Sequence, residues 1–219
     1  MNATQLKKKL KLLNTSIPET LYVRCHRAIS WLKCAEENSA DIDLQFITLW
    51  IAYNACYSID EKYETPSTEK ERYSEFITKL VKYDAEERFF NLLWNKFSGP
   101  VRLLIENEYL YKPFWDFQRG QHVKWKKLHY QSTINANKYL ANREVNLLLG
   151  VVLDRLYVLR NQLIHGGATY NSKVNRSQVK DAGNILNLLI PIIIEIIMEN
   201  GSEDWGNIYY PVIKTSATF

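Results

Sequence analysis

The feature that most constrains the fold is an apolar pattern of helical spacing that stops at two adjacent glycines. Five apolar residues follow one another at intervals of three, three, four and one: Leu153, Leu156, Leu159, Leu163 and Ile164. This spacing places side chains along one face of a helix. Gly166 and Gly167 come next, and glycine often ends a helix because it enters the left-handed conformation without a Cβ clash. The pattern predicts a helix over residues 143–165.

Three polar residues lie inside this pattern, namely Arg160, Asn161 and His165. Asn161 and His165 are four residues apart, so they share a helix face and the amide can orient the imidazole. Arg160 precedes His165 by five residues, about 140° around the helix axis, so only its long side chain reaches the same side. Together they supply a proton-transfer group, a polar orienter and a permanent cation, a set that suits phosphodiester chemistry.

A structural role for the same residues is the alternative that the spacing leaves open. Arg-x4-His is a short motif that also arises by chance. An arginine and a histidine near a helix end can simply satisfy the last backbone carbonyls.

The residues around this motif resemble a known family. Leu-Arg-Asn-Gln-Leu-Ile-His-Gly-Gly at 159–167 is similar to the Arg-Asn-x-x-x-His signature of the HEPN superfamily. Residues 46–57 resemble an early bundle helix of stand-alone bacterial HEPN proteins, and residues 97–102, 113–117 and 204–206 also look like that group. The resemblance covers most of the chain. It implies an all-α, HEPN-like antiparallel helical bundle and a metal-independent ribonuclease of a toxin–antitoxin or antiphage system.

The resemblance also implies a homodimer, because in HEPN proteins two copies of the motif meet across a two-fold axis. Arg160 and His165 of both chains would then line one cleft. His165 would move the ribose 2′ proton or protonate the leaving 5′ oxygen, Arg160 would stabilise charge on phosphate, and Asn161 would hold His165. The implied partners are an RNA substrate, with tRNA as one candidate, and an antitoxin or other defence partner. No cofactor is implied.

Two departures from the family pattern bear on these expectations. HEPN toxins controlled by a nucleotidyltransferase carry His-x-Tyr, whereas His165 is followed by two glycines and the nearest tyrosine is Tyr170. Control by adenylylation is therefore not expected. A HEPN core needs only four or five helices, so residues of about 61–120 look like a helical and aromatic insertion or flank.

The alternatives to a nuclease are an inactive HEPN module that binds RNA or nucleotides, and a helical assembly protein.

Composition is consistent with a single domain over residues 1–219. Hydrophobic residues make up 46% of 219 residues, enough for one generous core and too many for a disordered chain. The formal net charge of +4 allows nucleic acid as a partner without requiring it. Because eight scattered glycines form no phosphate loop and the carboxylates and cysteines follow no ligand spacing, neither a nucleotide cofactor nor a metal site is predicted.

A second candidate surface for RNA mixes basic and aromatic residues, as RNA-stacking surfaces do. It consists of Lys124, Trp125, Lys126 and Lys127, and Tyr170 follows the motif as a further candidate. A solvated helix face anchored by one tryptophan explains the lysine run equally well.

Three features bear on the compartment. Cys25, Cys34 and Cys56 give an odd count, which indicates reduced thiols in the cytoplasm. Residues 1–13 are polar and lysine-rich, unlike a signal peptide. The apolar run over residues 185–198 is too short to span about 30 Å of hydrocarbon and predicts a buried helix.

Elsewhere the patterns predict an almost entirely helical chain. Helices are expected over residues 4–13, 18–37, 44–57, 67–81, 85–97, 101–110, 122–140, 143–165 and 174–200, with an irregular aromatic stretch over 113–120 and a charged loop over 58–68. The short connection between the last two helices predicts that they are antiparallel neighbours.

Overall fold

A computed structural model describes residues 1–57, 69–173 and 176–213 of the chain. The predicted charged loop over 58–68 lies outside these residues. The described part contains helices and no strand, which confirms the predicted all-α fold. The elements in chain order are α1 Ala3–Leu12, α2 Glu19–Glu37, α3 Ile42–Tyr57, α4 Glu69–Lys82, α5 Arg88–Phe90, the π-helical turn η1 Asn91–Lys96, α6 Ser98–Glu106, the 3₁₀ turn η2 Glu108–Leu110, α7 Lys112–Gln118, α8 Trp125–Asn142, α9 Val145–Ile164 and α10 Arg176–Glu199.

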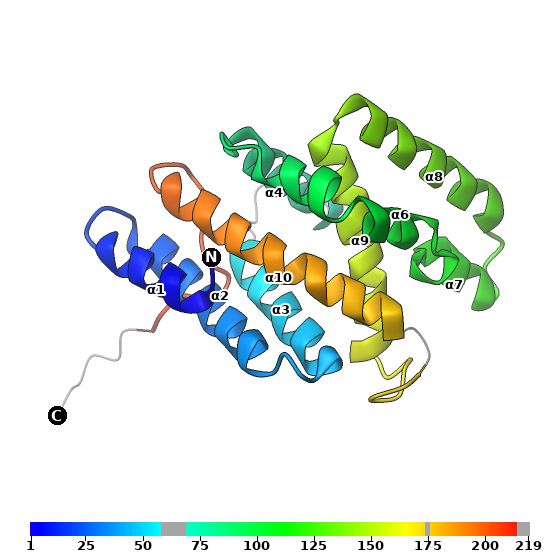
Figure 1. Cartoon of the computed structure of the whole chain (residues 1–219), viewed down its shortest axis with the longest axis horizontal. Helices are drawn as coiled ribbons and strands as arrows, with labels where there is room; N and C mark the ends of the chain where they lie inside the picture. Colours follow the sequence, from blue (N-terminus) through cyan, green and yellow to red (C-terminus); the bar gives the residue numbers. More distant parts are fainter. Residues whose placement is uncertain (58–68, 174–175, 214–219) are drawn as a thin grey trace.

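The helices form two packed groups (Figure 1). In the first group, α3 packs against both α2 and α10, and α1 covers α2 and α10. In the second group, α9 packs on α4, α6 and α8, while α7 packs on α8. The two groups meet where α9 contacts α3 and where α10 contacts α4 and α5. The motif helix is thus one of the elements that join the two halves of the fold.

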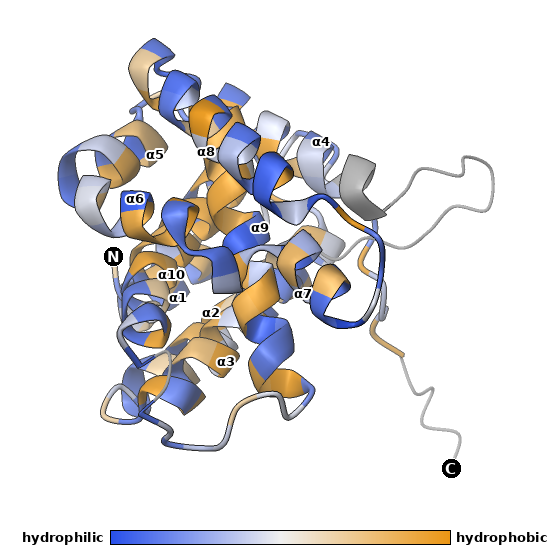
Figure 2. Ribbon diagram, turned by 90° about the vertical axis from the view of Figure 1, so that its right-hand side faces the viewer, coloured by the Kyte–Doolittle hydropathy of each residue, from blue (hydrophilic) through white to orange (hydrophobic). Residues whose placement is uncertain are grey.

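The core is continuous across both groups. α3 is apolar on nearly all sides because neighbours cover it, and Phe46, Leu49 and Tyr53 are fully buried. The predicted buried helix over 185–198 is confirmed, since most of the apolar side chains of α10 belong to the same core. By length and composition α10 would also fit a membrane span, and about 67% of its apolar window is buried inside the protein. Figure 2 shows apolar residues on the inward faces of the helices.

The predicted antiparallel pairing of the last two long helices is wrong. α10 packs mainly on α3 and α2, whereas α9 packs mainly on α8, α4 and α6 and runs across α10 (Figure 1). The physical reason lies in the connection between them. Tyr170 and Asn171 hydrogen-bond to Asp41 and Asp43 at the start of α3, so α10 departs along α3.

The stretch over 113–120, predicted to be irregular, contains the helix α7. Pro113 lies in its first turn, where a missing backbone N–H costs nothing, and Gly120 follows its end with φ of 85°. Side chains within the predicted insertion also join the common core, among them Phe76, Leu80 and Phe89. Residues 69–120 therefore contribute to the core that supports the motif helix.

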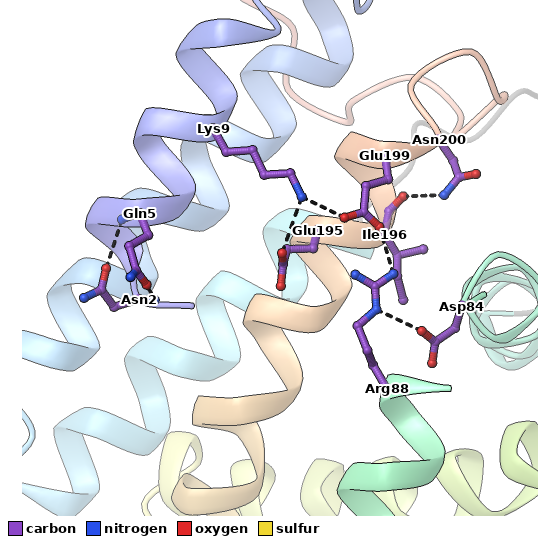
Figure 3. Close-up of polar contacts among 9 residues, drawn as sticks. All are labelled: Asn2, Gln5, Lys9, Asp84, Arg88, Glu195, Ile196, Glu199 and Asn200. Carbon is purple, nitrogen blue, oxygen red and sulfur yellow. Dashed lines mark hydrogen bonds and ion pairs between the residues drawn. The ribbon is translucent and has the colours of Figure 1, made fainter. Parts of the chain in front are cut away.

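An ion-pair network ties α1 to α10 and to the start of α5 (Figure 3). Lys9 Nζ contacts Glu199 at 2.7 Å and Glu195 at 3.4 Å, and Arg88 bridges Glu199 at 2.8 Å and Asp84 at 3.0 Å. Burial alone would raise the pKa of Glu199, but the hydrogen bonds from Arg88 and Lys9 lower it. This network stabilises the end of the fold that carries the C-terminal turn of α10.

Candidate functional site

The motif helix ends at the two predicted glycines. His165 is the last residue before the left-handed turn, and Gly166 has φ of 70°. The Gly166 N–H donates to Leu163 O at 3.3 Å and the Gly167 N–H donates to Gln162 O at 2.7 Å. These two bonds form a Schellman motif, which satisfies the last carbonyls without the motif side chains. Arg160 and His165 are therefore not needed to cap the helix.

Arg160 and Asn161 are joined by a side-chain hydrogen bond. Arg160 Nη1 donates to Asn161 Oδ1 at 2.8 Å, while Arg160 Nε is buried and has no partner among the described residues. At 100° per residue, Asn161 lies between Arg160 and His165 around the helix axis. The guanidinium therefore leans toward the face of α9 that Asn161 shares with His165.

Asn161 contacts His165 through the backbone. The His165 N–H donates to Asn161 O at 3.0 Å, and no hydrogen bond joins the asparagine amide to the imidazole within the described ranges. The predicted orientation of the imidazole by this amide is thus absent from the single chain, and the amide oxygen instead accepts from Arg160. The His165 side chain is exposed at the end of α9.

The loop after the motif is clamped to the first turn of α3. Tyr170 donates its hydroxyl hydrogen to the Asp41 carboxylate, which raises the pKa of Tyr170 and lowers that of Asp41. The Asn171 N–H donates to Asp43 Oδ2 at 2.9 Å, and Arg176 pairs with the same oxygen at 2.7 Å. Tyr170, predicted as an RNA contact, follows the motif with an exposed ring and a hydroxyl already engaged.

A small hollow lies under this loop. Its volume is about 10 Å³, which is room for about one water molecule. Its lining comes from the start of α3, from α9, from the loop and from the start of α10, and includes Asp43, Gln162, Thr169 and Arg176. Neither Arg160 nor His165 lines it. The hollow is therefore separate from the Arg160 and His165 side chains, of which His165 is exposed and Arg160 is half-buried.

The run from Lys124 to Lys127 forms the start of α8. Trp125 is half-buried and packs edge-on against Phe114, with ring centroids 5.0 Å apart, while Lys126 Nζ lies 5.8 Å from the Trp125 ring centre. The three lysines are exposed. The arrangement is that of an anchored, solvated basic face, and it adjoins α7.

The residue that connects this region to the motif helix is not among those that the sequence indicated. Gln162, which follows Asn161, donates from Nε2 to the carbonyl of Tyr109 in η2 at 2.7 Å. No local signal in the sequence marks this contact, because the two residues are 53 positions apart. It joins the motif helix to η2, on which α7 packs.

No match to this chain is found among protein-family models, curated proteins or solved structures. Within the described part of the chain, no group of three His, Cys, Asp or Glu side chains lies close enough together to hold a metal ion. The chemistry of the site is therefore inferred from its own residues.

Proposed function

We propose that this chain is a metal-independent RNA endonuclease of a bacterial toxin–antitoxin or antiphage system, acting as a homodimer with a HEPN-like composite site. The observation that carries the proposal is the pairing of Arg160 with Asn161 one helical turn before an exposed His165. A half-buried permanent cation and an exposed proton-transfer group thus lie in the last turns of one helix, and neither side chain is needed to cap it.

Each residue has a role that its position supports. His165 removes the ribose 2′ proton or protonates the leaving 5′ oxygen. Arg160 holds the charge that grows on the phosphate oxygens. Asn161 anchors the guanidinium through its side chain and His165 through its carbonyl. The products are a 2′,3′-cyclic phosphate and a 5′ hydroxyl, and DNA resists cleavage because it lacks the 2′ hydroxyl.

Cleavage needs both a base and an acid, whereas one chain offers one histidine at this site. A second copy supplies the other. The outer side of α9 supports this assembly, because Tyr157, Asn161 and Ile164 follow the spacing of four and three residues that forms a helix-pairing seam. Tyr157 is 41% exposed and Ile164 is 45% exposed in the single chain. Pairing along this stripe would bring the two motifs together.

A second candidate function is a non-catalytic module that binds RNA. The observation that favours it is that the His165 imidazole has no orienting hydrogen bond within the described chain. A binding module needs the cation of Arg160 and not a positioned proton-transfer group.

The deciding experiment compares purified wild-type protein with His165→Ala on total tRNA in the presence of a chelator. The proposal expects cleavage by the wild type alone and a terminal 2′,3′-cyclic phosphate on the product. RNA binding without cleavage by either protein would support the second candidate, and equal cleavage by both would assign the activity to another site or a contaminant.

A further inference from the structure

The segment from η2 to the start of α8, residues 108–127, contacts the motif helix at the Tyr109 carbonyl and at the Tyr111 ring, over which the Arg155 guanidinium of α9 lies at 4.5 Å. Tyr109 O accepts hydrogen bonds from Gln162 Nε2 and from the Trp115 indole N–H, each at 2.7 Å. Gln162 precedes His165 by three residues, so both lie on neighbouring parts of the same side of α9. The segment therefore begins beside the helical turn that carries His165.

Interlocked aromatic rings hold this segment in shape. The buried Phe114 ring meets the rings of Tyr109, Trp115 and Trp125 edge-on, with centroids 5.3, 5.1 and 5.0 Å apart. Edge-to-face pairs of this kind are favourable beyond the area that they bury. The 3₁₀ turn, α7 and the start of α8 are thus joined into one aromatic shelf, which we define as residues 108–127.

The shelf exposes rings as well as burying them. Tyr109 is 47% exposed and Phe117 is 48% exposed, although both belong to a segment with a well-packed centre. A folded chain can bury such rings, and Phe114 in the same segment is buried. Two half-exposed rings on a fixed support are suited to stacking against flat ligands.

The shelf also carries a net positive charge. It contains five basic and two acidic residues, a net charge of +3, compared with +4 for all 219 residues. Asp116 pairs with both Lys112 and Arg119, yet these two side chains remain 69% and 60% exposed. Exposed ion pairs contribute little, so both cations are available to a phosphate.

We infer that the aromatic shelf binds the single-stranded RNA that flanks the scissile bond, an inference that rests on the proposed nuclease function. Bases stack on Tyr109 and Phe117, and the basic side chains of the shelf follow the backbone phosphates. Proteins that bind single strands combine these two elements, aromatic rings and a cationic track. A duplex keeps its bases stacked inside, so it cannot use the rings.

The binding test uses the full chain carrying His165→Ala, so that the probe is not cut. The probe is a labelled, unpaired RNA of roughly 12 nucleotides, within the range of single-strand site sizes. Fluorescence anisotropy should show that Tyr109→Ala and Phe117→Ala each weaken binding about tenfold, as expected for the removal of one base stack. Tyr109→Trp should preserve binding. Both Tyr109 changes keep the backbone carbonyl that Gln162 and Trp115 use.

Tyr210→Ala is the matched control, because Tyr210 is 72% exposed and lies in the C-terminal segment outside the shelf. It should leave affinity unchanged. Replacing Lys124, Lys126 and Lys127 together by alanine should make the affinity less dependent on salt, by about one unit of slope for each phosphate that the variant no longer binds.

Four results would contradict the inference that the shelf binds single-stranded RNA. These are no RNA binding by the His165→Ala parent, equal binding by the parent and the two alanine variants, equal loss in Tyr210→Ala, or equally tight binding of a duplex of the same sequence. The nuclease proposal fails separately. If the wild type cuts no RNA while Tyr109→Ala still weakens binding about tenfold, RNA binding by the shelf is supported and the nuclease proposal fails. If the wild type cuts RNA while both ring variants bind RNA as tightly as the parent, the nuclease proposal is supported and RNA binding by the shelf is contradicted.

Discussion

Arg160 donates a hydrogen bond of 2.8 Å to Asn161, its neighbour in the chain, and this bond turns the guanidinium toward the side of α9 that ends in His165. Consecutive residues on a helix point about 100° apart, so they do not face each other by default. The hydrogen bond brings these two side chains together despite that separation. It makes Asn161 a support for the arginine, a role different from the one that the spacing alone had predicted.

The first prediction concerns the roles of Arg160 and Asn161 in cleavage. Arg160→Ala should lower the rate of RNA cleavage by about 10²–10⁴, as expected for losing a group that stabilises transition-state charge. Asn161→Ala should cost less, on the order of tenfold, because the cation remains and only its support is removed. Arg160→Lys should retain part of the rate, since a charge remains without the planar fork. Single-turnover cleavage of tRNA measures all three.

Circular dichroism provides the control for these variants, because the Schellman motif that ends α9 does not use their side chains. Helicity should equal that of the wild type. Full cleavage activity in Arg160→Ala would rule out the role given to the guanidinium.

The second prediction concerns dimer assembly along α9. Ile164→Glu places a charge on the exposed stripe beside Asn161 and should shift the protein from dimer to monomer in light scattering, with a parallel loss of cleavage. The matched control is Leu12→Glu, since Leu12 is 84% exposed at the end of α1, away from the stripe. A wild type that is monomeric at micromolar concentration, or an Ile164→Glu variant that remains a fully active dimer, would contradict this assembly.

The third prediction concerns the turn that follows His165. Gly166→Ala should destabilise the fold by about 1 kcal/mol, because alanine is strained at its φ of 70°. Gly99→Ala is the matched control, since Gly99 lies in the first turn of α6 with open space around it and should be neutral or slightly stabilising. Urea unfolding midpoints measure both. If both variants unfold at the same midpoint, the left-handed turn contributes nothing to stability.

The fourth prediction concerns the dependence of stability on pH. Burial, followed by the charge of Arg155, lowers the pKa of His129 from its ordinary value near 6.5, while the opposing effects of Glu108 and Ile105 are smaller. The unfolded chain therefore binds this proton more readily than the folded chain. The stability that the neutral, buried His129 contributes should then be complete above about pH 6.5. It should be lost progressively as the pH falls below that value.

The measurement for His129 is the urea midpoint at a series of pH values between about 7.5 and 5.5, above the range in which carboxylates titrate. His129→Gln should remove part of the fall, whereas His122→Gln, at an exposed position, should not. An unchanged pH profile in His129→Gln would show that burial of this imidazole does not affect stability.

Local patterns predicted most of the helices and the residues at their ends. The stop at Gly166 and the N-terminal limit of α2 after Pro18 both follow from backbone preferences of single residues. Pro113 misled the prediction, because a proline both breaks helices and begins them, and the neighbouring aromatic residues carry no clear period. The π-helical turn η1 has no local signal of its own.

Side-chain spacing and backbone preferences within a few residues predict that the chain is helical and where its main helices end. They also predict that Arg160, Asn161 and His165 lie on the last turns of one helix. Which helices are neighbours, and what surrounds the motif, depends on contacts between distant parts of the chain. Asp43 holding Arg176, and Tyr109 receiving Gln162, join residues 133 and 53 positions apart. Such contacts depend on how the whole apolar core packs, since many pairings of amphipathic helices satisfy the same local pattern.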